Sequence, residues 1–434
     1  MMRIAVEPRL RLDIGLRDVA AGLAACATRR DRLGCERELL ETWGDPDGLA
    51  CFSVRSAFDL LLDVLALPAG SEVAFSAITH PDVPRIARAH GLRVLPLDLD
   101  PDTLAPTAAA VDLAVRPGTR LVVVAHLFGS RVNLELLARR AAEVGALLVE
   151  DCAQTIRGPH DQGDPLADVS LFSFGAIKTA TALGGALVRV RDPQLAEALR
   201  CAQERLPVQR RSHQLSKLVK FSGLVLLCRP VLYGGLLRTL AALGRDPDAF
   251  VNGVVRAFPP IEARGDADAV EAACTEELLL RIRRAPSAPL LALVRRRLSR
   301  FDGRRLAARA ATGEAVACTL RAPLMQPGRG AALRTHWVLP VVSPEPEKLV
   351  AALRAAGFDA ARATSSIETV APPSDRPDLR PRAAEAMIEG IVFVPAPPDL
   401  GARRTRELVS ALAAAVVSDS PVEDAVLAGS EVHA

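Results

Sequence analysis

Between residues 50 and 200, short apolar runs alternate with stretches of helical periodicity, and this feature constrains the fold most strongly. The runs lack polar alternation, which is typical of strands buried on both faces of a sheet. Helical stretches between them, such as Leu134–Val144, imply right-handed crossovers and a largely parallel sheet. We therefore predict an α/β fold with strands at Val73–Phe75, Arg93–Leu97, Leu121–Ala125, Ala146–Val149, Val169–Phe172 and Ala186–Val190.

The remaining segments of the 434-residue chain differ from this region in their patterns. Residues 16–45 have helical apolar spacing and lead into a Gly- and Pro-containing break, whereas residues 200–333 are rich in Arg and Leu without convincing strands. Strand and helix patterns return at His336–Val342 and continue to Gly401–Val416. We expect a helical leader over 1–48, a large α/β domain over 49–214, a helical insertion over 215–333, a small α/β domain over 334–416 and a loose tail over 417–434.

Charge and cysteine content disfavour several classes of protein. The chain carries 54 basic and 51 acidic residues, so its net charge of +3 gives no reason to expect a nucleic-acid partner. The 8 cysteines form no C-x-x-C pair and no metal-type spacing, which favours reduced thiols and a cytoplasmic location over a disulfide scaffold or structural zinc. The charged N-terminal residues do not resemble a secretory signal.

Two short segments carry groups suited to catalysis. An acidic pair, Glu150 and Asp151, stands at the carboxyl end of a predicted buried strand, where open parallel sheets bind their ligands. Lys178 follows the next predicted strand among small residues, and the chain has only three other lysines, Lys217, Lys220 and Lys348. Pyridoxal phosphate needs an amine for a Schiff base, a carboxylate for its ring nitrogen and small or hydroxyl residues around its phosphate. The two segments therefore suggest chemistry that depends on pyridoxal phosphate.

Five motifs in order resemble those of the DegT/DnrJ/EryC1/StrS family of pyridoxal-phosphate aminotransferases, and the resemblance runs from about Phe52 to Arg200 and more weakly from Thr335 to Ala415. The E-D-x-A-Q motif is matched by Glu150-Asp151-Cys152-Ala153-Gln154, and the S-F-x-x-x-K motif by Ser173-Phe174-Gly175-Ala176-Ile177-Lys178. The other three resemble Ser53-Val54-Arg55-Ser56, Ser76-Ala77-Ile78-Thr79-His80 and His126-Leu127-Phe128-Gly129. One such motif alone would be weak evidence, whereas five with sensible gaps are strong evidence.

The resemblance implies a role for each matched residue. Lys178 would form the Schiff base and shuttle the substrate proton, and Asp151 would hold the ring nitrogen. Gln154 would lie at the ring oxygen and His80 would stack on the ring. Ser53, Ser56 and Ser173 would bind the phosphate, and Arg55 would add a charge-assisted contact where Val54 replaces the usual glycine. His126 is expected to be structural.

The resemblance also implies a function. It predicts a fold type I aminotransferase, a homodimer that moves an amino group from a donor, glutamate by resemblance, to a keto acceptor. The default acceptor is a nucleotide-linked keto sugar, although the G-x-N-x-R-M element common in sugar aminotransferases is absent. Two alternatives stay open: another pyridoxal-phosphate enzyme with a non-sugar substrate, and a non-catalytic scaffold with this fold at a membrane surface.

The segment 215–305 is the source of the membrane alternative. Two apolar stretches within 215–243 are separated by Arg229-Pro230, which leaves neither long enough to span a bilayer as one helix. Arg281 to Arg305 then adds nine arginines around an apolar core, a pattern of basic helices that lie peripherally on an anionic surface such as the inner membrane. The alternative interpretation of this segment is a dimerisation or lid insertion with a solvated basic face. Arg362 is a further candidate, for a substrate carboxylate.

Overall fold

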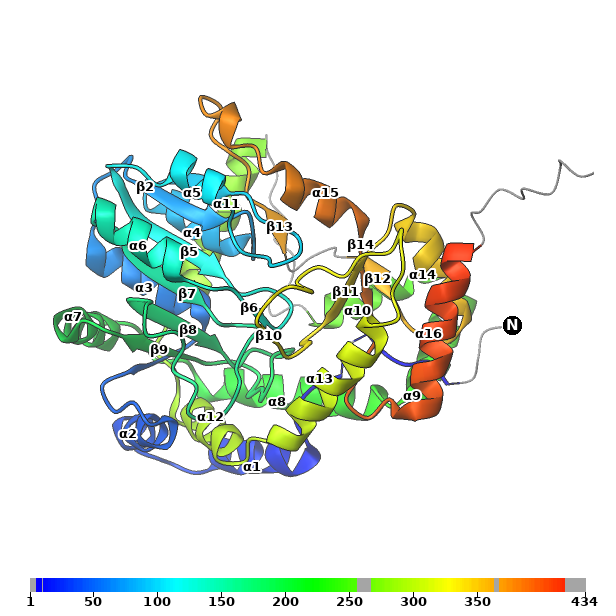
Figure 1. The fold of residues 1–434 in the computed structure, drawn as a ribbon. Coiled ribbons are helices and arrows are strands. Elements are labelled where there is room, and N and C mark those ends of the chain that lie inside the picture. The colour runs from blue at the N-terminus through cyan, green and yellow to red at the C-terminus, as the bar shows by residue number, and fades with distance from the viewer. Residues whose placement is uncertain (1–4, 10, 256–266, 363–366, 418–434) are drawn as a thin grey trace, which may run out of the picture.

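A seven-stranded sheet forms the centre of the computed structural model, which describes residues 5–9, 11–255, 267–362 and 367–417 (Figure 1). The strand order is β1 (Leu49–Cys51), β9 (Ala186–Val190), β8 (Val169–Ser173), β7 (Leu147–Asp151), β5 (Thr119–Ala125), β2 (Glu72–Ser76) and β4 (Arg93–Leu97). The five strands from β8 to β4 are parallel, whereas β9 is antiparallel to both of its neighbours. The predicted largely parallel α/β sheet is confirmed, with β1 as an additional strand at its edge.

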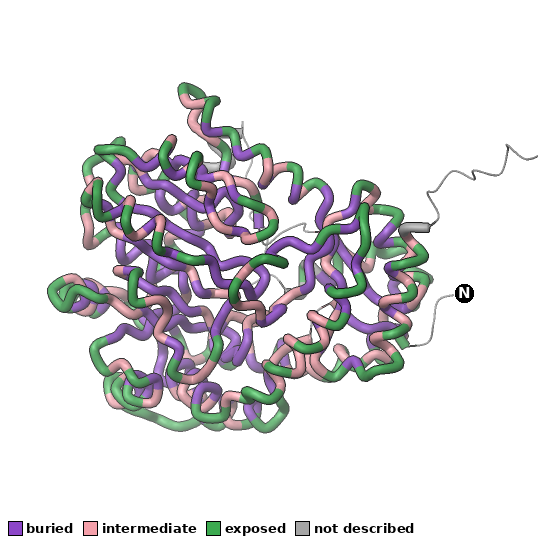
Figure 2. Tube along the Cα trace, viewed as in Figure 1, coloured by how far each residue is buried: buried purple, intermediate pink, exposed green. Residues whose placement is uncertain are grey.

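Helices cover both faces of this sheet. One face packs against α3 (Val54–Leu65), α4 (Asp82–Ala89), α7 (Pro193–Glu204) and α11 (Ala267–Ile282). The other packs against α5 (Ala108–Ala114), α6 (Glu135–Val144) and α15 (Arg382–Gly390). Figure 2 shows the strands as a buried band between these layers. Val73 and Val122 are fully buried on opposite faces, which explains why the strand sequences lack polar alternation.

The leader forms two helices, α1 (Leu16–Ala27) and α2 (Arg32–Trp43), as its periodicity predicts. They pack with α8 (Arg211–Leu227) and α12 (Ala288–Ser299) below the β8, β9 and β1 end of the sheet. Trp43 is fully buried there, its ring edge-on to Phe172 with centroids 5.7 Å apart. The N-terminal segment is therefore part of the core.

A smaller sheet forms the C-terminal part, with the order β11 (Leu339–Val342), β14 (Ile391–Val394) and β12 (Ala361–Arg362). All its pairs are antiparallel, and α13 (Gly303–Ala317), α14 (Pro346–Ala355) and α16 (Gly401–Val417) pack around it. Two separate two-stranded sheets pair C-terminal segments with segments of the large domain: β10 (Leu333–Arg334) with β6 (Ser130–Arg131), and β13 (Glu368–Thr369) with β3 (Ile78–Thr79). The predicted tail from residue 418 onward lies outside the described residues.

The Arg- and Leu-rich segment is helical, as predicted, and also includes α9 (Pro230–Ala242) and α10 (Pro247–Val255); η1 (Pro377–Leu379) is a short 3-10 helix elsewhere. The apolar core of α12 is buried against α1 and α2. Its arginines are paired with carboxylates: Arg296 and Arg297 with Asp18, and the more exposed Arg295 with Glu38. The leader therefore supplies counter-ions to α12, and the interpretation of a solvated basic face does not hold for the buried Arg297.

No single described helix is long and apolar enough to cross a bilayer. Only α8 and α9 taken together have the required length and apolar composition, and this pair is bent by 99°. This agrees with the prediction from the Arg229-Pro230 interruption.

Candidate active site

Asp151 and Lys178 meet at the carboxyl edge of the large sheet. Asp151 is the last residue of β7, and Lys178 lies in the loop that follows the adjacent parallel strand β8. Because neighbouring parallel strands end at the same edge, residues 27 positions apart come together. Each of the two charges shifts the pKa of the other group.

Lys178 lies in surroundings that favour its neutral form. Burial lowers the pKa of the Lys178 amine to about 8, with a further lowering from Arg55 and an opposing contribution from Asp151. The Nζ atom lies 4.2 Å from the ring centroid of Trp337, whose indole donates a hydrogen bond to Ile177 O (3.0 Å). A partly neutral amine is the form that attacks a carbonyl group.

Asp151 has the opposite shift. Burial raises the pKa of its carboxyl group, although Lys178, His126 and a hydrogen bond from Ala153 N (2.8 Å) favour the charged form. The Asp151 carboxylate therefore lacks full charge compensation, which suits a cationic group of a ligand.

A buried network of hydrogen bonds around His126 and Glu150 lies next to this edge of the sheet. His126 Nε2 lies 2.8 Å from Glu150 Oε2, and Val132 N donates to His126 Nδ1 (3.2 Å). Although burial opposes ionisation, the bond from His126 lowers the pKa of Glu150 to about 2. Both nitrogens of His126 are therefore engaged, so its closeness to Glu150 and Cys152 reflects a structural network rather than a set of free metal ligands. This is the structural role expected for His126.

Gln154 and Ser173 shape the loops around the site. Gln154 Oε1 accepts a hydrogen bond from Phe128 N (2.7 Å), where Phe128 adopts a left-handed φ of 59°. Ser173 ends β8, and its hydroxyl accepts a bond from Gly175 N (3.3 Å), at the start of the turn that leads to Lys178. Both residues thus fix the backbone beside the Asp151–Lys178 pair.

Ser53 caps the N-terminus of α3, with Oγ accepting from Ser56 N (3.1 Å). The first N–H groups of a helix have no partner inside the helix, so such an end suits a phosphate. The Ser56 hydroxyl, however, donates to Ile282 O (2.7 Å) and has no proton left for a phosphate oxygen in this arrangement. Arg55 pairs with Asp82 at 2.5 Å.

His80 lies beside the same helix end. Its Nδ1 accepts from Asp82 N (3.2 Å), and its side chain is half-buried. Burial of the ring lowers the pKa of His80, and Arg55 and Lys178 lower it further, whereas Asp82 opposes them. The structure thus brings His80, Arg55, Asp151 and Lys178 within electrostatic reach of one another.

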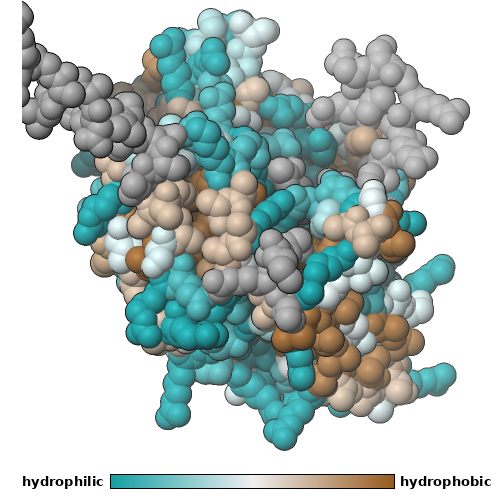
Figure 3. Space-filling view, turned by 90° about the vertical axis from the view of Figure 1, so that its right-hand side faces the viewer, coloured by the Kyte–Doolittle hydropathy of each residue, from teal (hydrophilic) through white to brown (hydrophobic). Residues whose placement is uncertain are grey.

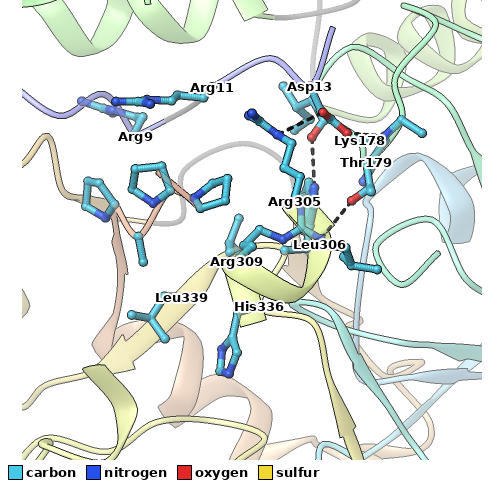
Figure 4. Close-up of a pocket in the computed structure, with 18 of the residues that line it drawn as sticks. Arg9, Arg11, Asp13, Lys178, Thr179, Arg305, Leu306, Arg309, His336 and Leu339 are labelled. Atoms are coloured by element: carbon cyan, nitrogen blue, oxygen red, sulfur yellow. Dashed lines mark hydrogen bonds and ion pairs between the residues drawn. The ribbon is translucent and has the colours of Figure 1, made fainter. Parts of the chain in front are cut away.

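Two residues of the site were missed in the sequence. Trp337 covers Lys178, and Arg309 of α13 lines the same pocket, donating to Thr179 Oγ1 (3.1 Å) and Thr335 O (3.0 Å) (Figure 4). One of only two tryptophans gave a weak signal, whereas an arginine among so many gave none. Arg362 instead binds Glu347 and is absent from the pocket lining.

The pocket beside Lys178 is strongly cationic. Five arginines line it: Arg9, Arg11, Arg297, Arg305 and Arg309. The first four form ion pairs with carboxylates, as Arg305 does with Asp13 at 3.3 Å. Within the described ranges, Arg309 has no carboxylate within 4.0 Å, and burial lowers its pKa to about 10. Arg309 is thus a partly buried cation suited to an anionic ligand.

These residues fit pyridoxal phosphate by their chemistry. A low-pKa amine is close to an undercompensated carboxylate, and the cation-rich N-terminus of α3 lies within electrostatic reach. Amine, carboxylate and anion-binding end are the three groups that this cofactor requires.

Comparisons with known proteins agree. Residues 30–220 match the DegT/DnrJ/EryC1/StrS aminotransferase family. The fold is similar to that of the aminotransferase TlmJ from Streptoalloteichus hindustanus (20% identity, 96% of this chain and 99% of that one, TM-score 0.64). It is also similar to the sugar aminotransferase CalS13 from Micromonospora echinospora (19%, 94% and 99%, 0.61) and to 3-amino-5-hydroxybenzoic acid synthase (19%, 95% and 100%, 0.66). The family match confirms the predicted resemblance, fold type and cofactor, and identifies the chain as a pyridoxal-phosphate-dependent aminotransferase.

Proposed function

We propose that this aminotransferase takes its amino group from glutamate and delivers it to a nucleotide-linked keto sugar. The observation that carries the proposal is that one pocket holds both a lysine of lowered pKa and an arginine that has no carboxylate partner among the described residues. Both glutamate and a nucleotide-linked sugar are anionic, so Arg309, the lining arginine without a carboxylate partner among the described residues, complements either substrate.

The predicted site residues have distinct tasks in this proposal. Bound pyridoxal phosphate supplies an electron sink for the substrate carbon that loses its proton. Lys178 holds the cofactor and then moves that proton on Nζ, for which a pKa of about 8 is well matched near neutral pH. Asp151 would hold a proton on the ring nitrogen, and His80 would pack against the ring. Gln154 would face the ring oxygen, and Ser53, Arg55 and Ser173 would surround the phosphate, whereas the Ser56 hydroxyl donates to Ile282 O instead.

Trp337 and Arg309 extend this assignment to the substrate. The indole of Trp337 covers one side of Lys178 and keeps water from the amine. Arg309 holds a carboxylate of the donor or a phosphate of the acceptor, because it is the lining arginine without a carboxylate partner among the described residues. Its bonds to Thr179 and Thr335 fix the guanidinium in place.

The test is the visible absorption spectrum of the purified protein before and after addition of glutamate. We expect a band from cofactor bound to Lys178 that glutamate removes, and no such band in Lys178→Ala. A band that glutamate leaves unchanged would contradict the donor. Purified wild type that shows no band after incubation with the cofactor would contradict the role of Lys178.

A second candidate is amination of a non-sugar acceptor. The name of 3-amino-5-hydroxybenzoic acid synthase refers to an aromatic amino acid, whereas CalS13 is named a sugar aminotransferase, so the shared fold supports both classes. Single-turnover assays of the amino-loaded enzyme with a nucleotide-linked keto sugar and with a free cyclic ketone distinguish them. Our proposal predicts turnover of the first substrate only.

Exposed apolar side chains on α8 and α9 bear on location and assembly. They are Leu215, Val219, Leu226, Leu227, Val231 and Leu232, and Figure 3 shows an apolar patch at its lower right, toward α9. By resemblance, we propose a cytoplasmic homodimer. The membrane-scaffold alternative depends on α8 and α9, because the arginines of α12 have carboxylate partners. Light scattering that gives a dimer, with no sedimentation on anionic vesicles, is the expected result.

A further inference from the structure

Positive charge gathers at the N-terminus of α3 beyond what the predicted site residues supply. Arg55, in the first turn of α3, lowers the pKa of three neighbours: Lys178, His80 and Lys217. The first two belong to the matched motifs, whereas Lys217 comes from α8 and has no part in the assignment above.

Lys217 is directed at the loop that follows Lys178 and is hydrogen-bonded to the residue before this helix end. A Cβ placed on Gly184 would lie 3.5 Å from Lys217 Nζ, and Nζ is 5.2 Å from the ring centroid of Phe52, directly before Ser53. Gly185 N donates to Phe52 O (3.0 Å), so Phe52 and the glycine pair form one wall. The neighbouring Gln214 donates from Nε2 to Ala182 O (3.4 Å), which fixes this face of α8 against the same loop.

The charge of Lys217 is not balanced within the described structure. No described carboxylate lies within 4.0 Å of its Nζ, whereas Arg55 is paired with Asp82 and Arg283 with Asp59. Burial lowers the pKa of Lys217 to about 8, with Arg55 and Lys220 acting in the same direction. Placing an uncompensated cation here costs folding free energy, and an anionic ligand would remove that cost.

We propose that Lys217 is a direct cationic ligand of the cofactor's phosphate, reaching it from α8 of the same chain. The inference rests on the proposed placement of the phosphate at the N-terminus of α3. It compensates for two features of that helix end. The Ser56 hydroxyl donates to Ile282 O rather than to a ligand, and the charge of Arg55 is shared with Asp82. The Lys217 ammonium supplies a contact that neither of them provides fully.

The test compares two cofactor forms that differ only in the phosphate. Lys217→Met should raise the Kd for pyridoxal phosphate, measured by absorbance titration of the cofactor-free protein, by about tenfold or more. The Kd for pyridoxal, which lacks the phosphate, should stay within about twofold of wild type. Lys220→Met is the matched control, since Lys220 is exposed on the same helix and should bind both forms as wild type does.

Two results would overturn the proposal. Equal weakening of pyridoxal and pyridoxal phosphate would mean that Lys217 only supports the fold, and an unchanged Kd for both would mean that it does not contact phosphate. Lys217→Arg, which keeps the charge, should restore most of the phosphate-dependent affinity and guards against misfolding as an explanation. These titrations contain no glutamate, so a wrong donor would leave their outcome unaffected.

Discussion

The carboxyl edge of the large sheet and the helical segment from α8 to α13 contribute to the same site in different ways. The sheet edge supplies Asp151 and Lys178 from short motifs in which the residue types and spacings are diagnostic. The helices supply Lys217 and Arg309, which have no motif around them and reach the site only through packing. The residues that carry the cofactor's chemistry can thus be recognised in short sequence motifs, whereas the charged residues around them are brought together only by the tertiary structure.

Asp151→Asn tests the sheet-edge half of this comparison and should have the largest effect. We expect kcat/KM to fall by about 100-fold or more, because the amide does not hold a proton on the ring nitrogen. Burial raises the pKa of Asp151, so its ionised form opposes folding of the cofactor-free protein. Asn should therefore leave the thermal stability of that form unchanged or higher. Lost stability with activity retained would contradict the assignment.

Arg309→Met tests the helical half. The donor's KM should rise by about tenfold to 100-fold, with a smaller change in kcat, because a charge-assisted contact to the substrate is lost. Arg304→Met on the same helix is the control, since Arg304 is exposed and is not among the pocket residues. Equal effects of the two substitutions would mean that general positive charge, rather than Arg309, attracts the donor.

The pH dependence of cofactor capture sharpens the comparison, because it reports how strongly the surroundings shift Lys178. A pKa of about 8, lowered from 10.5, leaves the amine increasingly protonated as pH falls below 8. The rate at which cofactor-free protein captures pyridoxal should fall by about tenfold per pH unit below pH 8 and level off above it. A rate that still rises through pH 10 would show an unshifted lysine. Stopped-flow absorbance provides the measurement.

Arg297→Met should destabilise the fold, since the buried Arg297 binds Asp18 at 2.6 Å. The free energy of unfolding should fall by about 3 kcal/mol, against less than about 1 kcal/mol for the more exposed Arg295→Met. Urea titration would show the difference. Similar small losses for both would contradict the structural role of the α12 arginines.

The sequence predicted the sheet because β2, β4, β5, β7, β8 and β9 are apolar on both faces, a pattern that needs no partner to be recognised. It could not reveal β1, a strand of three residues that is defined by its pairing with β9. The carboxylate partners of the α12 arginines could not be recognised either, because Asp18 and Glu38 lie more than 250 positions away in the chain.

The residues of the candidate site likewise fall into those that local sequence reveals and those that only tertiary packing reveals. Asp151, Gln154, Ser173 and Lys178 were found through motifs with fixed spacing. Trp337 covers Lys178 from 159 positions away, and Arg309 is one arginine among many, so neither is marked by local sequence. Ser56 shows that a motif can also mislead. Its position in the motif suggests a phosphate ligand, but its hydroxyl donates to Ile282 O, which the sequence does not reveal.

The most direct test of the account is to identify the lysine that carries the cofactor. Borohydride reduction of the loaded protein fixes pyridoxal phosphate to its amine, and peptide mass spectrometry then locates the modification. Only Lys178, Lys217, Lys220 and Lys348 can be modified among the side chains, so the assignment is unambiguous. The account predicts a stoichiometric label on Lys178 alone. A label on Lys217, or labelling spread over the four, would contradict it.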